Sequence, residues 1–322
     1  GDYEYIAEKG LETMIAIARF WAQRVNYSRQ KSKYVILGVT GPNEYENNVN
    51  NNWYTNYLAQ WSLEQTYIYL EDFKKNHPED YIRIRQKVQL NDDEPEMWKE
   101  IVEHMYLPYD KTFEVYLQQD NFLDKEIIPA TELDSEERPI NQNWSWDRIL
   151  RSCYIKQADV LQGFYFFESH FSKESLERHF DFYEPLTVHE SSLSPCVHAV
   201  LAASLGKLDK AYEMYLRTSR LDLDDYNKEV KEGLHITSMA GTWMSIVEGF
   251  GGLRIKNQIL SLNPQLPEQW KSLDFKINYR SQIIDVKINK NQTSISLQGN
   301  QSVNMYLFGE LIKLEPNKVF QT

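Results

Sequence analysis

The sequence predicts a mainly α-helical domain followed by a small antiparallel β-domain. Up to about residue 250, apolar side chains recur at the three- to four-residue spacing of amphipathic helices. From residue 251 onward, apolar and polar side chains alternate, as they do in strands that bury one face of a sheet. We therefore place a helical domain at residues 1–250 and a β-domain at residues 251–322.

The first predicted helices flank a polar loop. Apolar residues at helical spacing predict one helix at about Tyr3–Val25 and another that begins near Trp53. Shorter polar helices are expected within Asn76–Met105, on the outer surface. The irregular segment that follows carries the acidic run Glu132–Glu137, for which a solvated surface loop is favoured and a lid over the site is the alternative.

The remaining helices form pairs. We predict helices at Ser152–Ser169, Cys196–Leu205, Leu208–Arg217 and Ser238–Phe250. The second of these is apolar almost all round, which places it inside the domain, and Ser194 is expected to cap its N-terminus. Paired inner and outer helices whose loops meet at one end predict part of an α/α barrel.

Alternating residues mark the strands of the β-domain. They predict strands around Leu273–Tyr279, Ile284–Ile288 and Met305–Leu314, with a turn at residues 289–292. No group of residues in this domain suggests chemistry. Its expected role is to pack against the helices.

Composition argues against several classes of partner. The net charge of −12 and the lack of a basic run argue against nucleic-acid binding, and any anionic ligand would need a local positive pocket. No apolar stretch approaches the ~20 residues that span a bilayer, so no membrane partner is expected. Cys153 and Cys196 lie in apolar sequence without metal-ligand spacing, which predicts reduced core residues of a cytoplasmic protein and no metal site.

The stretch at residues 38–56 has the composition of a carbohydrate site. It combines Glu44 with many amides and several aromatic residues, which bind sugar hydroxyls and sugar C–H faces. A carboxylic acid beside a glycosidic oxygen can also protonate the leaving group. The alternative is a polar loop of Asn-rich turns, in which Asn bonds its own backbone.

Four ordered blocks carry a resemblance to a known family. The first pairs residues 41–45, Gly-Pro-Asn-Glu-Tyr, with 52–56, Asn-Trp-Tyr-Thr-Asn; the others are 141–148, 155–161 and 188–195. Together they resemble the disaccharide phosphorylases of glycoside hydrolase family 65. Members of that family are longer, with a β-sandwich and the first half of an (α/α)6 barrel ahead of these blocks. The resemblance therefore implies the C-terminal half of the barrel, followed by the β-domain.

The resemblance implies inverting phosphorolysis of an α-glucosyl disaccharide. Maltose and phosphate would give β-D-glucose 1-phosphate and D-glucose, with trehalose or kojibiose as alternative substrates. A trehalase-like hydrolase of the same fold and a non-catalytic sugar-binding fragment remain open. Inorganic phosphate would be the co-substrate, without a cofactor. The resemblance also implies a homodimer and a missing N-terminal half, without which the chain is expected to be inactive.

The same resemblance assigns roles to individual residues. Glu44 would be the general acid, buried so that it stays protonated, and Glu46 is a competitor that the motif does not favour. The other assignments are Lys156, Gln157, His189, Ser191 and Ser192 for phosphate, and Tyr45, Asn52 and Trp53 for the sugar.

A phosphate nucleophile requires cationic and hydroxyl groups rather than a second carboxylate. The loop at residues 187–194 provides these and leads into a helix N-terminus, which favours an anion. We expect a protonated His189, so that phosphate use peaks near pH 6 to 7 on rough reference values. Glu190 would be the base of a hydrolase.

Four neighbouring residues receive further assignments. Asp147 and Arg148 are expected to form a structural ion pair near the site. His235 and Ser238 are candidates for the pocket rim, with ordinary structural roles equally favoured.

Overall fold

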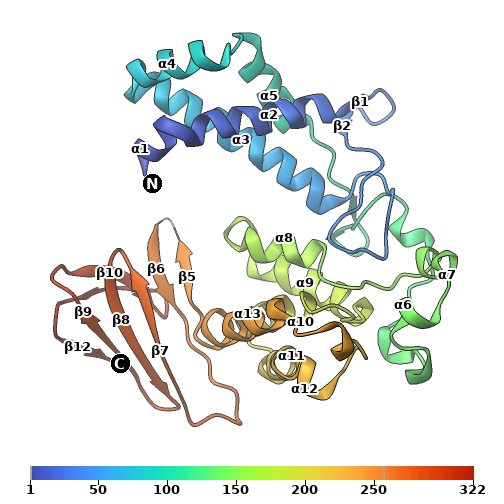
Figure 1. Cartoon of the computed structure of the whole chain (residues 1–322), viewed down its shortest axis with the longest axis vertical. Coiled ribbons are helices and arrows are strands. Elements are labelled where there is room, and N and C mark those ends of the chain that lie inside the picture. The colour runs from blue at the N-terminus through green and yellow to red at the C-terminus, as the bar shows by residue number, and fades with distance from the viewer. Residues whose placement is uncertain (1, 257) are drawn as a thin grey trace. The chain divides into compact units, whose positions relative to one another are not determined.

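The computed structural model describes residues 2–256 and 258–322. It divides into two compact units: Gly1–Ile127 with Leu150–Cys153, and Ile128–Ile149 with Tyr154–Thr322. Helices dominate up to residue 250 and strands dominate after it, which confirms the prediction of a mainly helical part followed by a sheet domain (Figure 1). The (α/α)6 barrel stays a prediction. Among the described residues, no helix has both the length and the apolar content that crossing a membrane requires.

The first unit is a small helical assembly. Its elements are α1 (Tyr3–Tyr5), a π-helical turn (Ile6–Gly10), α2 (Leu11–Arg24), β1 (Asn26–Ser28), β2 (Lys33–Val35), α3 (Trp53–Asn76), α4 (Pro78–Val88), α5 (Asp93–His104), β3 (Tyr109–Asp110), β4 (Val115–Tyr116) and a 3₁₀ turn (Phe122–Asp124). The helices predicted at Tyr3–Val25 and from Trp53 are confirmed. Helices α4 and α5 also contribute Ile84 and Trp98 to the core, so they are more than a surface layer.

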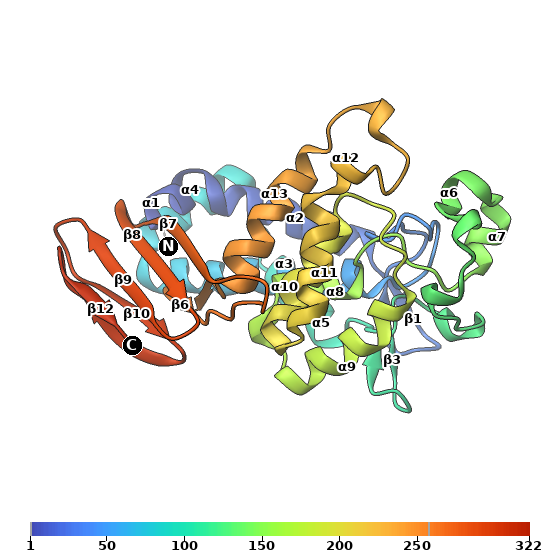
Figure 2. The ribbon, with the colours of Figure 1, turned by 90° about the horizontal axis from the view of Figure 1, so that it is seen from below.

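Helix α10 is the centre of the second unit. The helices of this part of the chain are α6 (Ile140–Asn143), α7 (Trp146–Arg151), α8 (Val160–Phe166), α9 (Lys173–Tyr183), α10 (Ser194–Leu205), α11 (Leu208–Ser219), α12 (Leu221–Asp224), α13 (Ile236–Met244) and a π-helix (Ser245–Phe250). Helix α10 packs against α8, α9, α11 and α13 (Figure 2). Gly206 ends α10 at φ 81°, a left-handed conformation that favours glycine, and thereby allows the turn into α11.

Two local predictions in this unit are wrong. The helix predicted at Ser152–Ser169 starts only at Val160, because the backbone of Ile155 bonds to a neighbouring segment: its N–H donates to Leu186 O (3.0 Å) and its carbonyl accepts from Val188 N (2.8 Å). Ser194 does not cap α10; it is the first helical residue, and its hydroxyl contacts another side chain.

The C-terminal strands form two four-stranded sheets. The strands are β5 (Arg254–Lys256), β6 (Ile259–Leu262), β7 (Ser272–Tyr279), β8 (Gln282–Asn289), β9 (Thr293–Gln298), β10 (Val303–Leu307), β11 (Glu310–Leu314) and β12 (Val319–Gln321). Their orders are β11-β10-β6-β5 and β12-β9-β8-β7, and most of these strands are labelled in Figures 1 and 2. Apolar residues of both sheets share one core. The β6–β10 pair is parallel, so the prediction of a purely antiparallel domain needs this correction.

The sheets are attached to the helices as predicted. Trp270 packs edge-on against Phe250, with ring centroids 4.8 Å apart, and Arg254 Nε lies 2.5 Å from Glu168 Oε2. Gln265 N–H donates to Phe250 O (2.8 Å). Gly252 makes this junction possible, because it adopts φ +64° and a Cβ there would lie 2.3 Å from Asn263 O.

Replacing Gly252 by Ala is expected to lower the free energy of unfolding by about 2 kcal/mol, since backbone strain and a backbone clash coincide. Urea unfolding followed by circular dichroism measures the change. Gly10→Ala is the matched control: Gly10 lies at a helical φ of −64° with ordinary contacts, so this variant is expected to be neutral or slightly stabilising. Equal effects of the two substitutions would contradict the argument.

Candidate functional site

Amide side chains shape the loop between β2 and α3. Asn51 Oδ1 accepts from Ile36 N–H (3.1 Å), and Asn50 Oδ1 accepts from Gly38 N–H (3.1 Å). Asn51 has φ 55°, a left-handed conformation that Asn tolerates. These Asn side chains therefore have a structural role, as expected if the segment is a polar loop in which Asn bonds the nearby backbone.

The three predicted sugar-binding residues lie in the interior of the first unit. Asn52 caps α3 by accepting from Thr55 N–H (2.9 Å). Trp53 is fully buried and stacks on Tyr57 and Tyr116, with centroids 5.1 and 5.2 Å away. Tyr45 is 1% exposed. These side chains hold the loop, and direct contact with a sugar stays a prediction.

Glu44 and Glu46 point to different environments. Glu44 is exposed, whereas Glu46 is 6% exposed and forms an ion pair with Lys125. The burial expected at Glu44 is therefore not provided by the described residues. The pairing of Glu46 nevertheless favours Glu44 as the acid, because a carboxylate engaged by a lysine is a poor proton donor.

The predicted phosphate residues come together in the second unit. Ile155 and Thr187 form a parallel bridge, and Glu190 N–H donates to Lys156 O (3.2 Å). The segment that carries Lys156 and Gln157 thus runs beside the loop that carries His189. Two blocks separated by about thirty residues in sequence therefore form one local structure.

His189 is buried and neutral. Its side chain is 4% exposed, and its Nδ1 lies 2.8 Å from Ser194 Oγ. Burial, followed by the nearby charges of Arg217, Lys210 and Arg138, holds the pKa of His189 well below its usual value. The prediction of a protonated His189 is therefore wrong, because an imidazolium would lose hydration in a positive environment.

A neutral His189 can still bind an anion as a hydrogen-bond donor. A Ser194 hydroxyl that donates to Nδ1 leaves the ring proton on Nε2. The Nε2 atom is buried, has no hydrogen-bond partner among the described residues, and lies 3.9 Å from Glu184 Oε1. An acceptor such as a phosphate oxygen would satisfy this donor.

Two arginines hold the backbone on either side of His189. Arg138 Nη2 donates to Val188 O, and Arg217 Nη2 donates to Val188 O and His189 O, both at 3.1 Å. The sequence analysis missed both arginines. No motif marks an isolated arginine. The sequence indicated only that an anionic ligand would need a local positive pocket, without saying which residues form it.

Glu190 is part of this support. Its Oε2 accepts from Ile140 N–H (2.9 Å), and its Oε1 lies 3.4 Å from Arg138 Nε. The side chain is 2% exposed. These contacts give Glu190 a structural role and argue against the base that a hydrolase would require.

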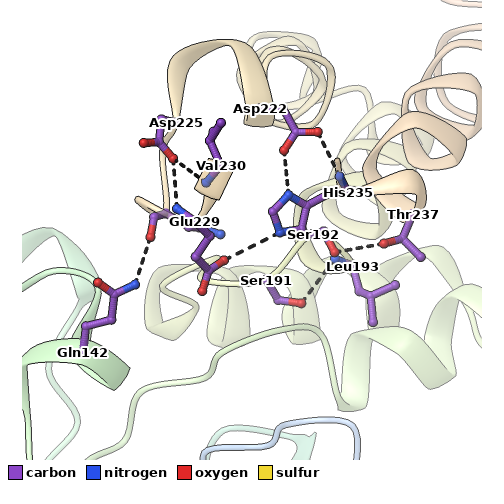
Figure 3. A network of polar contacts seen from close by, with 11 residues as sticks. Gln142, Ser191, Ser192, Leu193, Asp222, Asp225, Glu229, Val230, His235 and Thr237 are labelled. Atoms are coloured by element: carbon purple, nitrogen blue, oxygen red, sulfur yellow. Dashed lines mark hydrogen bonds and ion pairs between the residues drawn. The ribbon is translucent and has the colours of Figure 1, made fainter. Parts of the chain in front are cut away.

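One serine of the loop, Ser192, meets the start of α13, whereas Ser191 contacts its own loop (Figure 3). Ser192 Oγ lies 2.9 Å from Thr237 Oγ1, and Ser191 Oγ accepts from Leu193 N–H (3.2 Å). His235 lies beside them, with Nδ1 2.6 Å from Asp222 Oδ1, and its place at a pocket rim stays a prediction (Figure 3). Sequence reasoning missed both Thr237 and Asp222.

Other predicted residues have structural partners. Ser238 is buried and donates to Thr218 O, so it is not a rim residue. Arg148 forms an ion pair with Glu137 (2.7 Å). The sequence had suggested Asp147 as its partner and had not indicated Glu137. Both cysteines are buried, as predicted for core residues.

A cavity of about 490 Å³ lies elsewhere in the second unit. It is lined by the start of α9, the end of α10, the π-helix and strands β5 and β6. No predicted site residue lines it, and two of its charged residues, Glu168 and Arg254, pair with each other.

Three buried histidines predict acid sensitivity. Burial lowers the pKa of His179 to about 4 and the pKa values of His189 and His198 well below 6.5. As pH falls, the histidines of the unfolded chain therefore bind protons before those of the folded chain. The contribution of the buried histidines to the free energy of unfolding is complete above about pH 6.5 and is lost progressively below it. Each histidine contributes a slope of up to about 1.4 kcal/mol per pH unit.

Urea unfolding between pH 7.5 and 5 measures this loss of stability. His179→Phe keeps an aromatic ring against Phe164, whose centroid lies 4.3 Å away, and removes one proton-binding group. The slope should become shallower in this variant. A stability that does not change over this range in the unmodified protein would overturn the argument.

Comparisons with known proteins identify the family of this chain. The model of the "glycosyl hydrolase family 65 central catalytic domain" matches residues 1–244, and that of the family's C-terminal domain matches residues 253–314. The chain is 50% identical to maltose phosphorylase of Bacillus subtilis over 98% of its length and 39% identical to α,α-trehalose phosphorylase of Thermoanaerobacter brockii over 99%. It spans 41% of the length of each.

A solved structure gives the same result. A human-microbiome protein assigned as a kojibiose phosphorylase superposes on the whole chain with a TM-score of 0.91 at 33% identity, and the chain covers 47% of it. With both family domains matched along its sequence, this chain belongs to glycosyl hydrolase family 65.

Proposed function

We propose that the chain is the C-terminal portion of a disaccharide phosphorylase that converts maltose and phosphate into β-D-glucose 1-phosphate and D-glucose. Its 50% identity to a maltose phosphorylase supports this substrate. In this proposal the helices complete an (α/α)6 barrel with an N-terminal half, in a cytoplasmic homodimer. The chain's span of 41% of that relative supports the additional half.

The observation that carries the proposal is the loop around His189. The Nε2 atom of His189 is buried and has no hydrogen-bond partner among the described residues, and the loop runs beside the Lys156 segment. Glu190, in contrast, is engaged by Arg138 and Ile140. Such a site suits an anionic nucleophile better than a water that needs a base.

The reaction then follows from these groups. Lys156, Gln157, His189, Ser191 and Ser192 bind phosphate, whose oxygen attacks the anomeric carbon from the face opposite the leaving glucose. The bond between that carbon and the glycosidic oxygen breaks, and Glu44 gives its proton to that oxygen. Attack from the opposite face inverts an α-glucoside to the β-phosphate.

Product analysis with the full-length protein tests this proposal. Maltose should disappear only when phosphate is present, with equal amounts of glucose and β-glucose 1-phosphate, which phosphorus NMR identifies. The 322-residue chain alone should form neither product, because half a barrel cannot close the sugar subsite. Glucose release without phosphate would favour the hydrolase, and activity of the isolated chain would refute the need for the other half.

A trehalose or kojibiose linkage is the second candidate. The 39% identity to a trehalose phosphorylase and the structural similarity to an assigned kojibiose phosphorylase support this alternative. Initial rates with maltose, trehalose and kojibiose at equal concentration separate the three substrates.

A further inference from the structure

We propose that Arg217, on α11, is a positioning residue of the phosphate site: it fixes the His189 loop and supplies the unpaired positive charge that the nucleophile meets. This inference rests on the proposed phosphorolysis. It adds a residue that lies outside the blocks from which the site was predicted.

The contacts of Arg217 explain how it positions the loop. Its Nη2 donates to two successive carbonyls, Val188 O and His189 O, each at 3.1 Å. His189 adopts φ 55°, a conformation that costs free energy for a residue other than glycine and persists only where its surroundings impose it. The guanidinium group is well suited to this task, because its planar donors are rigid.

The charge of Arg217 is not neutralised by a carboxylate. Of the other cations near His189, Lys210 Nζ lies 3.1 Å from Glu184, and Arg138 Nε lies 3.4 Å from Glu190. Across residues 2–256 and 258–322, no carboxylate lies within ion-pair distance of Arg217. Its Nε atom is buried and has no hydrogen-bond partner in that part of the chain.

A partly buried cation without a counter-ion favours an incoming anion. Burial is the main cause of the lowered pKa of Arg217, and the neighbouring charge of Arg138 is the next. Arginine nevertheless stays protonated, so it retains a positive charge that no carboxylate of the described residues pairs. A phosphate dianion gains from that charge, whereas the neutral hydroxyls of a sugar gain little.

Steady-state kinetics of the full-length enzyme test the inference with two variants. Arg217→Met removes the charge, whereas Arg217→Lys keeps the charge and loses the planar set of guanidinium donors. Arg217→Met should raise the KM for phosphate about ten- to hundredfold, with the KM for maltose within about twofold. Arg217→Lys should recover part of this loss. In the reverse reaction, the KM for β-glucose 1-phosphate should rise and the KM for glucose should not.

Arg220→Met is the matched control. It removes an exposed arginine at the end of the same helix, whose partner is Asp224 at 2.7 Å, and should leave both KM values unchanged. A KM for phosphate within about twofold of the unmodified enzyme in both Arg217 variants would overturn the inference. So would a change in the KM for maltose as large as that for phosphate. An unmodified enzyme that cleaves maltose without phosphate would instead refute the proposed function.

Discussion

Replacing Glu44 by Gln in the full-length enzyme is expected to lower the rate of maltose phosphorolysis by about 10²–10⁴-fold. The amide keeps the size of the side chain but has no proton to give to the leaving glucose. Binding of maltose should change little, because Gln keeps the size of this exposed side chain. The measurement is kcat and KM for maltose at saturating phosphate.

A substrate that needs no proton separates chemistry from structure. The leaving group of α-glucosyl fluoride is fluoride ion, which needs no proton. Glu44→Gln should therefore slow the reaction of α-glucosyl fluoride with phosphate far less than the reaction of maltose with phosphate. Glu46→Gln tests the competing carboxylate. Because it breaks the contact with Lys125, it should lower thermal stability and affect both substrates alike. Equal losses on both substrates with Glu44→Gln would show that Glu44 is not the acid.

Replacing His189 or Lys156 by Ala is expected to weaken apparent phosphate affinity by about ten- to a hundredfold, since each removes a contact to a charged group worth about 1.5–3 kcal/mol. Binding of glucose to the free enzyme should barely change. Lys173→Ala, at an exposed lysine that begins α9, is the control and should leave phosphate use unchanged.

The pH dependence of phosphate use distinguishes the two states of His189. Because burial and nearby positive charges hold the pKa of His189 well below its usual value, we expect a neutral imidazole between pH 6 and 8. The KM for phosphate in this range should therefore follow the ionisation of phosphate alone, in the unmodified enzyme and in His189→Ala. An additional titration near pH 6.5 that disappears in His189→Ala would show a protonated histidine and contradict the structure.

Local patterns predicted the helices well and their tertiary partners poorly. Helix α10 follows from a continuous apolar run that ends at Gly206, so both its burial and its end are visible in the sequence. The irregular segment before α8 is not visible, because Ile155 pairs with Thr187 more than thirty residues away. Ser194 likewise has the sequence of a cap, yet its hydroxyl contacts His189.

In the candidate site, too, the sequence predicted local features but not tertiary contacts. The motif blocks located Lys156 and His189, and the fold brings their segments together. The arginines that hold this loop could not be inferred, because Arg138 and Arg217 acquire their roles only through contacts with backbone carbonyls distant in sequence. The neutral state of His189 also depends on burial and on those charges, neither of which periodicity reveals.

The parallel β6–β10 pair sets an order of assembly for the C-terminal domain. Strands β7, β8 and β9 pair with their neighbours in sequence and can associate as soon as each is synthesised, whereas β6 must wait for residues 303–307. Until then the apolar side chains of Leu260 and Leu262, which are 2% and 0% exposed in the folded domain, have no β10 to cover them. We therefore expect a nascent chain that stalls before β10 to display an uncovered β6 edge, which is the kind of surface that chaperones bind and that aggregates when they do not.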